Sequence, residues 1–386
     1  MYKKYYQLFL EANKGVQHYA SHSHHYWPDV TRKAMLDYWD DSAKFVDDKW
    51  ANIFEIKIPN VQRLIADVLN LSHPEQIVFA PNTHEFVTRI LSCFKPGKKI
   101  RILTTDSEFY SFDRQINRLI EDQTVEVVKV QTQPFISFEA RFKDRLQSQD
   151  WDLVFLSQVF FNSGVAVQDL VSLVSQVANP ETVIVIDGYH AFMALPTNLQ
   201  GLEDRVFYIA GSYKYAQGGE GCCFMTVPKG TQLKPSNTGW FAGFSGLTHV
   251  GSLVAYSDDG YRFAGSTMDF SALYRLEASL SLFAKADLSV AKIHRHVQNL
   301  QKNFLNDIKS FSHPEHSQWL NEKNLLVYDL NKHGHFLTFD TGNPEITKNL
   351  HDEFNKAGIR TDYRGARWRF GFGLYQEAHI DFSKIN

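Results

Sequence analysis

The sequence has little cysteine and no excess of charge of either sign. Its three cysteines are Cys93, Cys222 and Cys223, and the adjacent pair is poorly placed to form a disulfide with itself. A disulfide framework is therefore excluded, and a reducing cytoplasm is the expected compartment. The 40 basic residues nearly balance the 43 acidic ones. This balance argues against nucleic acid as a partner, and we expect small molecules and a second copy of the chain instead.

Long hydrophobic runs are also missing. No stretch reaches the roughly 20 apolar residues that a membrane-spanning helix needs. Residues 1–11 lack the apolar core and the small-residue cleavage site of a secretory signal. We therefore expect a cytoplasmic protein with no membrane contact. Its length suits two domains and is ample to bury a core.

Helical and strand-like patterns alternate over the first half of the chain. Helical spacing of apolar residues is found at 60–71, 83–94, 112–120, 138–146 and 168–178. Strand-like runs are found at 76–80, 101–105, 125–130, 152–156, 182–187 and 206–210. This alternation predicts an α/β fold in which helices flank a mostly parallel sheet. Such sheets bind ligands beyond the carboxyl ends of their strands.

The last third of the chain has a different pattern. A long helix is predicted from residue 270 to about 308, followed by strands at 324–330, 336–339 and 367–372 and a helix at 344–357. This pattern predicts a smaller α+β C-terminal domain. We therefore divide the chain into an N-terminal arm (1–50), a large ligand-binding domain (51–268) and a small domain (269–386).

Two strand ends carry the residues with the clearest chemistry. The predicted strand 182–187 ends in Asp187-Gly-Tyr-His190, and the next one runs into Gly211-Ser-Tyr213-Lys214 with a glycine-rich tail. A pyridoxal phosphate (PLP) enzyme needs such a pair. The carboxylate keeps the pyridine nitrogen protonated, and the lysine amine forms a Schiff base with the cofactor aldehyde. Asp187 and Lys214 are therefore the predicted catalytic residues.

These motifs resemble the kynureninase branch of the class V aminotransferase superfamily, whose members are fold type I PLP enzymes. The resemblance covers most of the chain, from Ser23 to Tyr375, and is most specific between Asp187 and Gly221. It implies PLP as the cofactor, bound by the large domain. It also implies that His190 lies near the ring hydroxyl, although a histidine buried in the core and bonded to backbone is the alternative. Tyr213 becomes a ligand of the cofactor phosphate.

Further cofactor contacts follow from the resemblance. Asn82 and Thr83 start a predicted helix just after a strand, where free backbone N–H groups bind phosphate well. The same residues could serve simply as a helix cap, and the two roles can coexist. Phe109 is expected to stack on the pyridine ring. Trp240 and Thr267 are expected to reach the phosphate of a neighbouring subunit, which implies a homodimer with shared active sites. For Trp240, core packing is the alternative.

The substrate side of the predicted site draws on both ends of the chain. A substrate α-carboxylate is bound best by an arginine, and the resemblance assigns this role to Arg369, with Arg367 left open. The N-terminal loop is expected to face the substrate through Ser23 and His24. Three histidines at 22, 24 and 25 are also a pattern for zinc, but no further ligand accompanies them, so we expect no metal.

The expected reaction begins with Lys214 removing the Cα proton of an amino acid. If the substrate carries a γ-carbonyl, hydrolysis of the Cβ–Cγ bond gives alanine and an aromatic acid, as in kynureninases. Transamination or β-elimination on another amino acid is the alternative. No cysteine follows Cys223, which argues against a cysteine desulfurase. A binding protein without turnover is the remote alternative, because Asp187 and Lys214 are both present.

Overall fold

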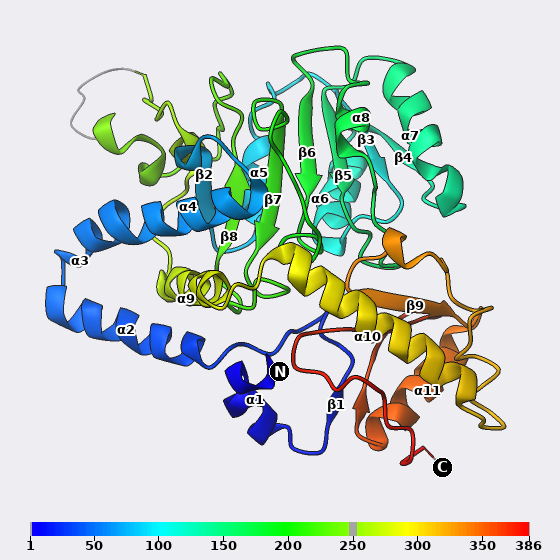
Figure 1. The fold of residues 1–386 in the computed structure, drawn as a ribbon. Helices are drawn as coiled ribbons and strands as arrows, with labels where there is room; N and C mark the ends of the chain where they lie inside the picture. The colour runs from blue at the N-terminus through cyan, green and yellow to red at the C-terminus, as the bar shows by residue number, and fades with distance from the viewer. Residues whose placement is uncertain (1, 247–252, 386) are drawn as a thin grey trace.

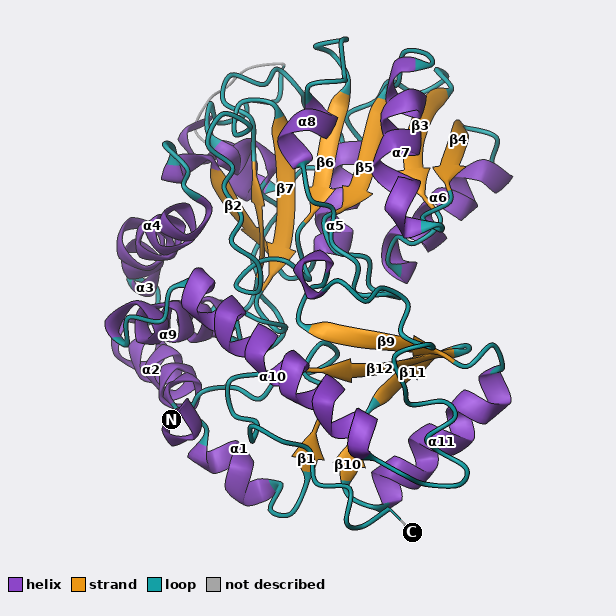
Figure 2. Cartoon of the chain, turned by 45° about the vertical axis from the view of Figure 1, so that its right-hand side comes forward, coloured by secondary structure: helices purple, strands orange, loops and turns teal. Residues whose placement is uncertain are grey.

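The computed structural model describes residues 2–246 and 253–385 and places its two larger sheets in neighbouring halves of the molecule (Figures 1 and 2). The larger sheet has seven strands in the order β2-β8-β7-β6-β5-β3-β4. Its strands are β2 (Ile77–Ala80), β3 (Ile100–Thr105), β4 (Val125–Val130), β5 (Leu153–Ser157), β6 (Val183–Asp187), β7 (Val206–Gly211) and β8 (Cys223–Thr226).

The predicted α/β architecture is confirmed. Strands β4, β3, β5, β6 and β7 run parallel, and β8 is antiparallel to both of its neighbours. Nearly continuous apolar sequences make the central strands, because helices cover both faces of the sheet. The helices of this half are α4 (Ile58–Leu69), α5 (Thr83–Leu91), α6 (Tyr110–Glu121), α7 (Phe138–Gln147) and α8 (Leu170–Val174).

Between β3 and β5 the direction in which the chain adds strands to the sheet changes, although the two strands are parallel. After β3 the chain adds β4 on one side, then crosses over to add β5, β6 and β7 on the other. The pairing of β3 with β5 covers only Ile102 with Leu153 and Leu103 with Val154, so the two strands separate towards their carboxyl ends. Such a switch point opens a crevice beyond the strand ends, which is where open parallel sheets bind ligands.

The second half of the molecule holds a three-stranded antiparallel sheet in the order β11-β12-β9 (Figure 2). Its strands are β9 (Phe336–Asp340), β11 (Asp362–Arg364) and β12 (Arg367–Gly371). Helices α10 (Val290–Ser310) and α11 (Pro344–Lys356) accompany this sheet. The N-terminal segment joins the same half, because β1 (Gln17–His18) pairs with β10 (Ile359–Arg360).

The remaining helices connect the two halves. α9 (Ser271–Lys285) leads from the large half towards α10, and α2 (Val30–Phe45) runs beside it (Figure 1). The short helices α1 (Gln7–Ala12) and α3 (Lys49–Ala51) complete the N-terminal region. None of the helices in the described residues is long and apolar enough to span a membrane. The division into residues 1–50, 51–268 and 269–386 remains our proposal.

Three sequence predictions of secondary structure were wrong. The long helix from 270 to 308 is two helices, because Asp287 takes a left-handed backbone conformation (φ 53°) and the Ser289 side chain caps α10. The helix expected at 168–178 shortens to α8, where Ser175 bonds the Ser172 carbonyl instead of extending the helix. Residues 324–330 form no strand: Leu325 makes an isolated bridge to Phe339 before the chain turns away.

Candidate active site

A cavity of about 160 Å³ lies at the carboxyl ends of the parallel strands. It is lined by Asn82, Thr83, His84, Phe109, Ser111, Ser157, Val159, Phe161, Asp187, Tyr189, His190, Tyr213 and Lys214. Every cofactor contact predicted within one subunit is in this set. The residues come from five segments far apart in sequence, so the fold brings together what the sequence only suggested.

Lys214 lies in a tight loop just past β7. The loop is anchored by the Gly218 N–H donating to the Ser212 carbonyl (2.9 Å) and by the Ser279 hydroxyl donating to the Ala216 carbonyl (2.6 Å). Gly211 is required at the end of β7, because the Tyr189 ring occupies the space where a side chain would stand. This anchoring holds the lysine side chain in one direction, towards the cavity.

The Lys214 amine is buried and hydrogen-bonded to Nε2 of His190. It lies 5.7 Å from the ring centre of Phe109, 5.5 Å from that of Tyr189 and 5.7 Å from that of Tyr213. Burial, and next the positive charge of Arg369, lower the pKa of Lys214 to about 7. A lysine with this pKa is partly neutral at physiological pH, which both a nucleophile and a base require.

Asp187 and His190 flank the lysine. Asp187 ends β6, and one of its carboxylate oxygens accepts the Tyr189 N–H (2.9 Å). Burial raises the pKa of Asp187 to about 6, while the Tyr189 N–H and the Lys214 charge act in the opposite direction. Burial and the Lys214 charge lower the pKa of His190 well below its usual value. His190 is therefore a neutral side chain bonded to the lysine, rather than a core histidine bonded only to backbone.

Asn82 and Thr83 lie where strand β2 gives way to helix α5. The Asn82 side chain accepts the Glu85 N–H (3.0 Å), so it is a true N-cap. Both residues also line the cavity, so the capped helix start faces it. The first turn of a helix presents N–H groups without intrahelical partners and the positive end of the helix dipole. The capping role and a phosphate-binding role are thus compatible here.

Phe109 and Phe161 line the cavity, and Tyr110 packs against both rings from outside the lining. Phe109 is 40% exposed and Tyr110 is 56% exposed, and both contact Phe161 at ring-centre distances of 5.5 and 5.1 Å. Phe109 precedes α6 in an extended conformation, which turns its ring towards the lysine rather than into the core. A planar ligand could stack on these rings.

Arg369 approaches the site from the small sheet. Its guanidinium is buried, donates to the Phe161 carbonyl and forms an ion pair with Asp362. Asp362 stands opposite Arg369 in the β11–β12 register and also accepts from Arg364 at 2.8 Å. Arg367, the alternative carboxylate ligand, is only half-buried and donates to the Asn162 carbonyl at 3.4 Å.

The N-terminal loop contacts the Asp362–Arg369 pair through His22, which lies outside the cavity lining. Ser23 and His24 are absent from the cavity lining, and the His24 ring is largely exposed beside Glu220. His22 is buried instead, stacked on Phe336 at 4.5 Å with Nε2 3.4 Å from the Asp362 carboxylate. Spacing alone gave no signal that distinguished His22 from its neighbours. Ser23 and His24 remain predicted substrate contacts.

Trp240 and Thr267 also lie outside the cavity. The two segments are joined, because the Phe241 N–H donates to the Gly265 carbonyl at 3.1 Å. Trp240 is 42% exposed and contacts Phe241 and Phe244, so it is not a core residue within this subunit. Thr267 is exposed as well. Their placement at the surface is compatible with a contribution to a neighbouring subunit.

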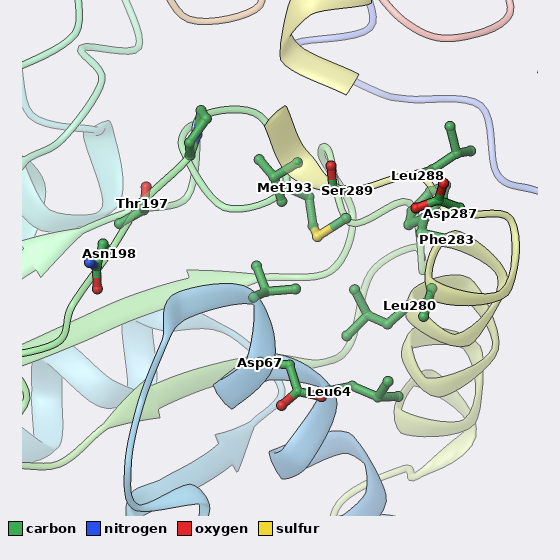
Figure 3. Close-up of a pocket in the computed structure, with 14 residues that line it drawn as sticks. Leu64, Asp67, Met193, Thr197, Asn198, Leu280, Phe283, Asp287, Leu288 and Ser289 are labelled. Atoms are coloured by element: carbon green, nitrogen blue, oxygen red, sulfur yellow. The ribbon is translucent and has the colours of Figure 1, made fainter. Parts of the chain in front are cut away.

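A larger cavity, of about 420 Å³, lies between α4, the end of α9 and residues 193–198 (Figure 3). Its walls are mostly apolar, and its acidic side chains are Asp67 and Asp287. It contains no residue of the predicted site and no candidate base or nucleophile beside a charged partner. The candidate active site is therefore chosen by its cluster of titratable groups rather than by cavity size. The described residues hold no group of three side chains suited to a metal ion.

Residues 28–334 match the model of the family described as aminotransferase class-V, so the chain belongs to this family. Members use PLP, and the chain is a PLP-dependent enzyme that acts on amino acids.

Solved structures with the same fold include two of C-DES. One is a lysine-to-alanine variant with glycine covalently linked to the PLP cofactor (TM-score 0.79, 15% identity, 95% of each chain covered). The other is the cystine C–S lyase C-DES with its product cysteine persulfide (0.78, 15%, 98% of this chain and 97% of that one). A third is apo cysteine desulfurase from Thermococcus onnurineus NA1 (0.74, 16%, 94% and 91%). No curated protein sequence gives a significant match.

The residues of the cavity fit PLP. A buried amine with its pKa near neutrality, a buried carboxylate and a helix start are the groups that the aldehyde, the pyridine nitrogen and the phosphate of PLP require. Nδ1 of His190 is buried without a hydrogen-bond partner in the described residues, as expected of an atom that a ligand would satisfy.

Proposed function

We propose that this enzyme uses water to hydrolyse the Cβ–Cγ bond of an amino acid with an aromatic acyl side chain, so that the hydroxyl goes to the acyl carbon and the products are alanine and an aromatic acid. The observation that carries the proposal is the pair of rings in the cavity lining, Phe109 and Phe161, next to the buried Arg369, which donates to the Phe161 carbonyl. An aromatic side chain could pack on the rings while the guanidinium binds the α-carboxylate.

The proposed roles of the chain's own residues follow from their positions. Lys214 would hold the cofactor aldehyde, and its amine, when neutral, would accept the Cα proton of the substrate. Asp187 would pair with the pyridine nitrogen, and His190 hydrogen-bonds the Lys214 amine. Arg369 orients the α-carboxylate. PLP itself supplies an electron sink for the charge that develops at Cα.

A second candidate is β-elimination on a sulfur-containing amino acid. The fold similarity to the cystine C–S lyase C-DES favours it. Elimination uses the same Lys214 and Asp187 and needs no protein thiol. A desulfurase-type mechanism is not proposed, because Cys222 and Cys223 are buried and burial raises the pKa of both thiols.

One experiment separates the two candidates. The purified protein is loaded with PLP and offered L-kynurenine, 3-hydroxykynurenine and L-cystine in parallel. Formation of alanine with an anthranilate-type fluorescent product supports Cβ–Cγ hydrolysis. Formation of pyruvate from cystine, with no product from the kynurenines, refutes the first candidate and supports the second.

We also propose a homodimer in which Trp240 and Thr267 complete the site of the other subunit. Trp240 packs with Phe244 beside a surface cavity that Trp50 and Phe54 also line, so an aromatic surface is available for contact. Mixing inactive Lys214→Ala subunits with Trp240→Ala subunits tests the shared site. Recovery of activity on mixing is expected, since a mixed dimer keeps one intact site; no recovery would contradict the proposal.

A further inference from the structure

Glu108 is a buried carboxyl group to which the proposed function gives no role. It lies between β3 and Phe109, is 5% exposed, and forms no ion pair within residues 2–246 and 253–385. Its side chain spans the fork where β3 and β5 separate and reaches Ser157, the last residue of β5. Ser157 lines the cavity and pairs in register with Asp187. Glu108 therefore lies directly behind a cavity wall.

The hydrogen bonds around Glu108 restrict where its protons lie. The Thr105 hydroxyl accepts the Ser107 N–H (3.1 Å), so its own hydrogen is available to donate to Oε1 of Glu108 (2.6 Å). The Ser157 N–H donates to the same oxygen at 3.3 Å. Within residues 2–246 and 253–385, Oε2 has one hydrogen-bond partner, the Ser157 hydroxyl. In this last bond the donor depends on whether the carboxyl group is ionised.

The surroundings favour the neutral acid. Within the described residues Glu108 forms no ion pair with a cationic side chain, and Asp187 on β6 is a charged group that acts on it. Burial raises the pKa of Glu108 to about 8, with the Asp187 charge acting in the same direction and the Ser157 and Thr105 bonds opposing it. Two neighbouring buried carboxylates would repel each other, whereas one neutral acid beside one carboxylate would not.

We propose that Glu108 is a neutral carboxylic acid that donates its proton to Ser157, so that the Ser157 hydroxyl donates its own hydrogen bond into the cavity. Glu108 is then a positioning residue that acts through Ser157. An ionised Glu108 would instead accept the Ser157 hydrogen and leave the cavity without this donor. The identity of the group that accepts the Ser157 hydrogen bond rests on the proposed function. The protonation state of Glu108 does not, because it is a property of the ligand-free protein.

The first test is infrared spectroscopy of the ligand-free protein at pH 7. The difference between wild type and Glu108→Gln should show the carbonyl stretch of a protonated carboxylic acid, and the band should persist in Asp187→Asn. A wild-type spectrum without that band would overturn the proposal. So would a band that is kept in Glu108→Gln and lost in Asp187→Asn, because it would belong to Asp187. Because Gln matches Glu in shape, thermal unfolding of Glu108→Gln checks that the fold is kept.

The second test is the affinity for PLP, measured by fluorescence titration. Ser157→Ala removes the proposed donor and should weaken binding roughly tenfold, the size of one hydrogen bond. Glu108→Ala should weaken it to a similar extent, whereas the Glu108→Gln amide can still donate to Ser157 and should rescue binding. Equal losses in Glu108→Gln and Glu108→Ala would refute a neutral donor. If wild type failed to bind PLP, the proposed function would fail while the infrared band remained.

Discussion

The two halves of the candidate active site differ in how their charged side chains are paired. In the half contributed by the large sheet, Lys214 is bonded to a neutral histidine and Asp187 to a backbone N–H. In the half contributed by the small sheet, Arg364 and Arg369 share Asp362 as an ion-pair partner. Burial acts to raise the pKa of Asp362, but the hydrogen bond from His22 and the charges of Arg369 and Arg364 hold it far below its usual value.

This difference indicates which groups await a ligand. A buried charge is costly unless it is paired, so the large-sheet half keeps Lys214 poised near neutrality and leaves Asp187 for a cationic partner. The small-sheet half is assembled in advance, and its two arginines exceed the single carboxylate by one positive charge. We infer that the first half binds the cofactor and the second half binds an anionic group of the substrate.

Replacing Lys214 by alanine should have the largest effect, because it removes the central residue of the large-sheet half. Without the amine no Schiff base forms, and loss of the base should lower turnover by at least roughly 10²–10⁴-fold. Borohydride reduction of PLP-treated protein followed by peptide mass spectrometry measures the attachment. Lys229→Ala, a change at an exposed lysine, is the matched control. A PLP adduct formed at full yield in Lys214→Ala would show that another residue holds the cofactor.

Replacing Asp187 by alanine should have the next largest effect. Removing the carboxylate takes away the partner of the pyridine nitrogen, and turnover should fall roughly 10²–10³-fold, as when a preorganised electrostatic contact is lost. Binding of PLP should weaken as well. Steady-state rates and a PLP titration measure both quantities. Near-normal turnover would assign Asp187 a merely structural role.

Exchanging arginine for lysine tests the small-sheet half. Arg369→Lys loses the planar donor pair and should raise KM roughly ten- to a hundredfold, because one or two charge-assisted hydrogen bonds are lost. Arg367→Lys is the matched change on the same strand and should alter KM little. The opposite ranking of the two variants would transfer the carboxylate-binding role to Arg367. Circular dichroism checks that both variants fold.

The smallest expected effect is a shift in the pH dependence of PLP trapping at Lys214, which measures the electrostatic coupling between the two halves. Trapping of PLP at position 214 should increase as pH rises through about 7, because only the deprotonated amine attacks the aldehyde. Arg369 is the charge that most lowers the pKa of Lys214, so Arg369→Met should move the midpoint upwards. Asp187→Ala should move it downwards, since Asp187 raises that pKa. An unchanged midpoint in Arg369→Met would mean that the two halves are electrostatically independent, and an unchanged midpoint in Asp187→Ala would mean that Asp187 does not act on Lys214 within the large-sheet half.

Local patterns in the sequence predicted the large sheet and the cofactor side of the cavity. Apolar runs bounded by turn residues determine β6 and β7, and Asp187 and Lys214 follow them directly. Local sequence patterns predicted the boundaries of helices and strands less well in the second half of the chain. The break between α9 and α10 depends on the left-handed Asp287 and the Ser289 cap, which a continuous helical pattern conceals.

Strand periodicity and strand-end position are local properties of the chain, so they predicted the fold class and the positions of Asp187 and Lys214, while the motifs around these two residues indicated the cofactor. Long-range packing was needed to show that His22 is buried while His24 is exposed, and that Arg369 shares Asp362 with Arg364. It also placed Glu108 behind Ser157. These contacts join segments distant in sequence, so burial and pairing fix them only when the two sheets come together.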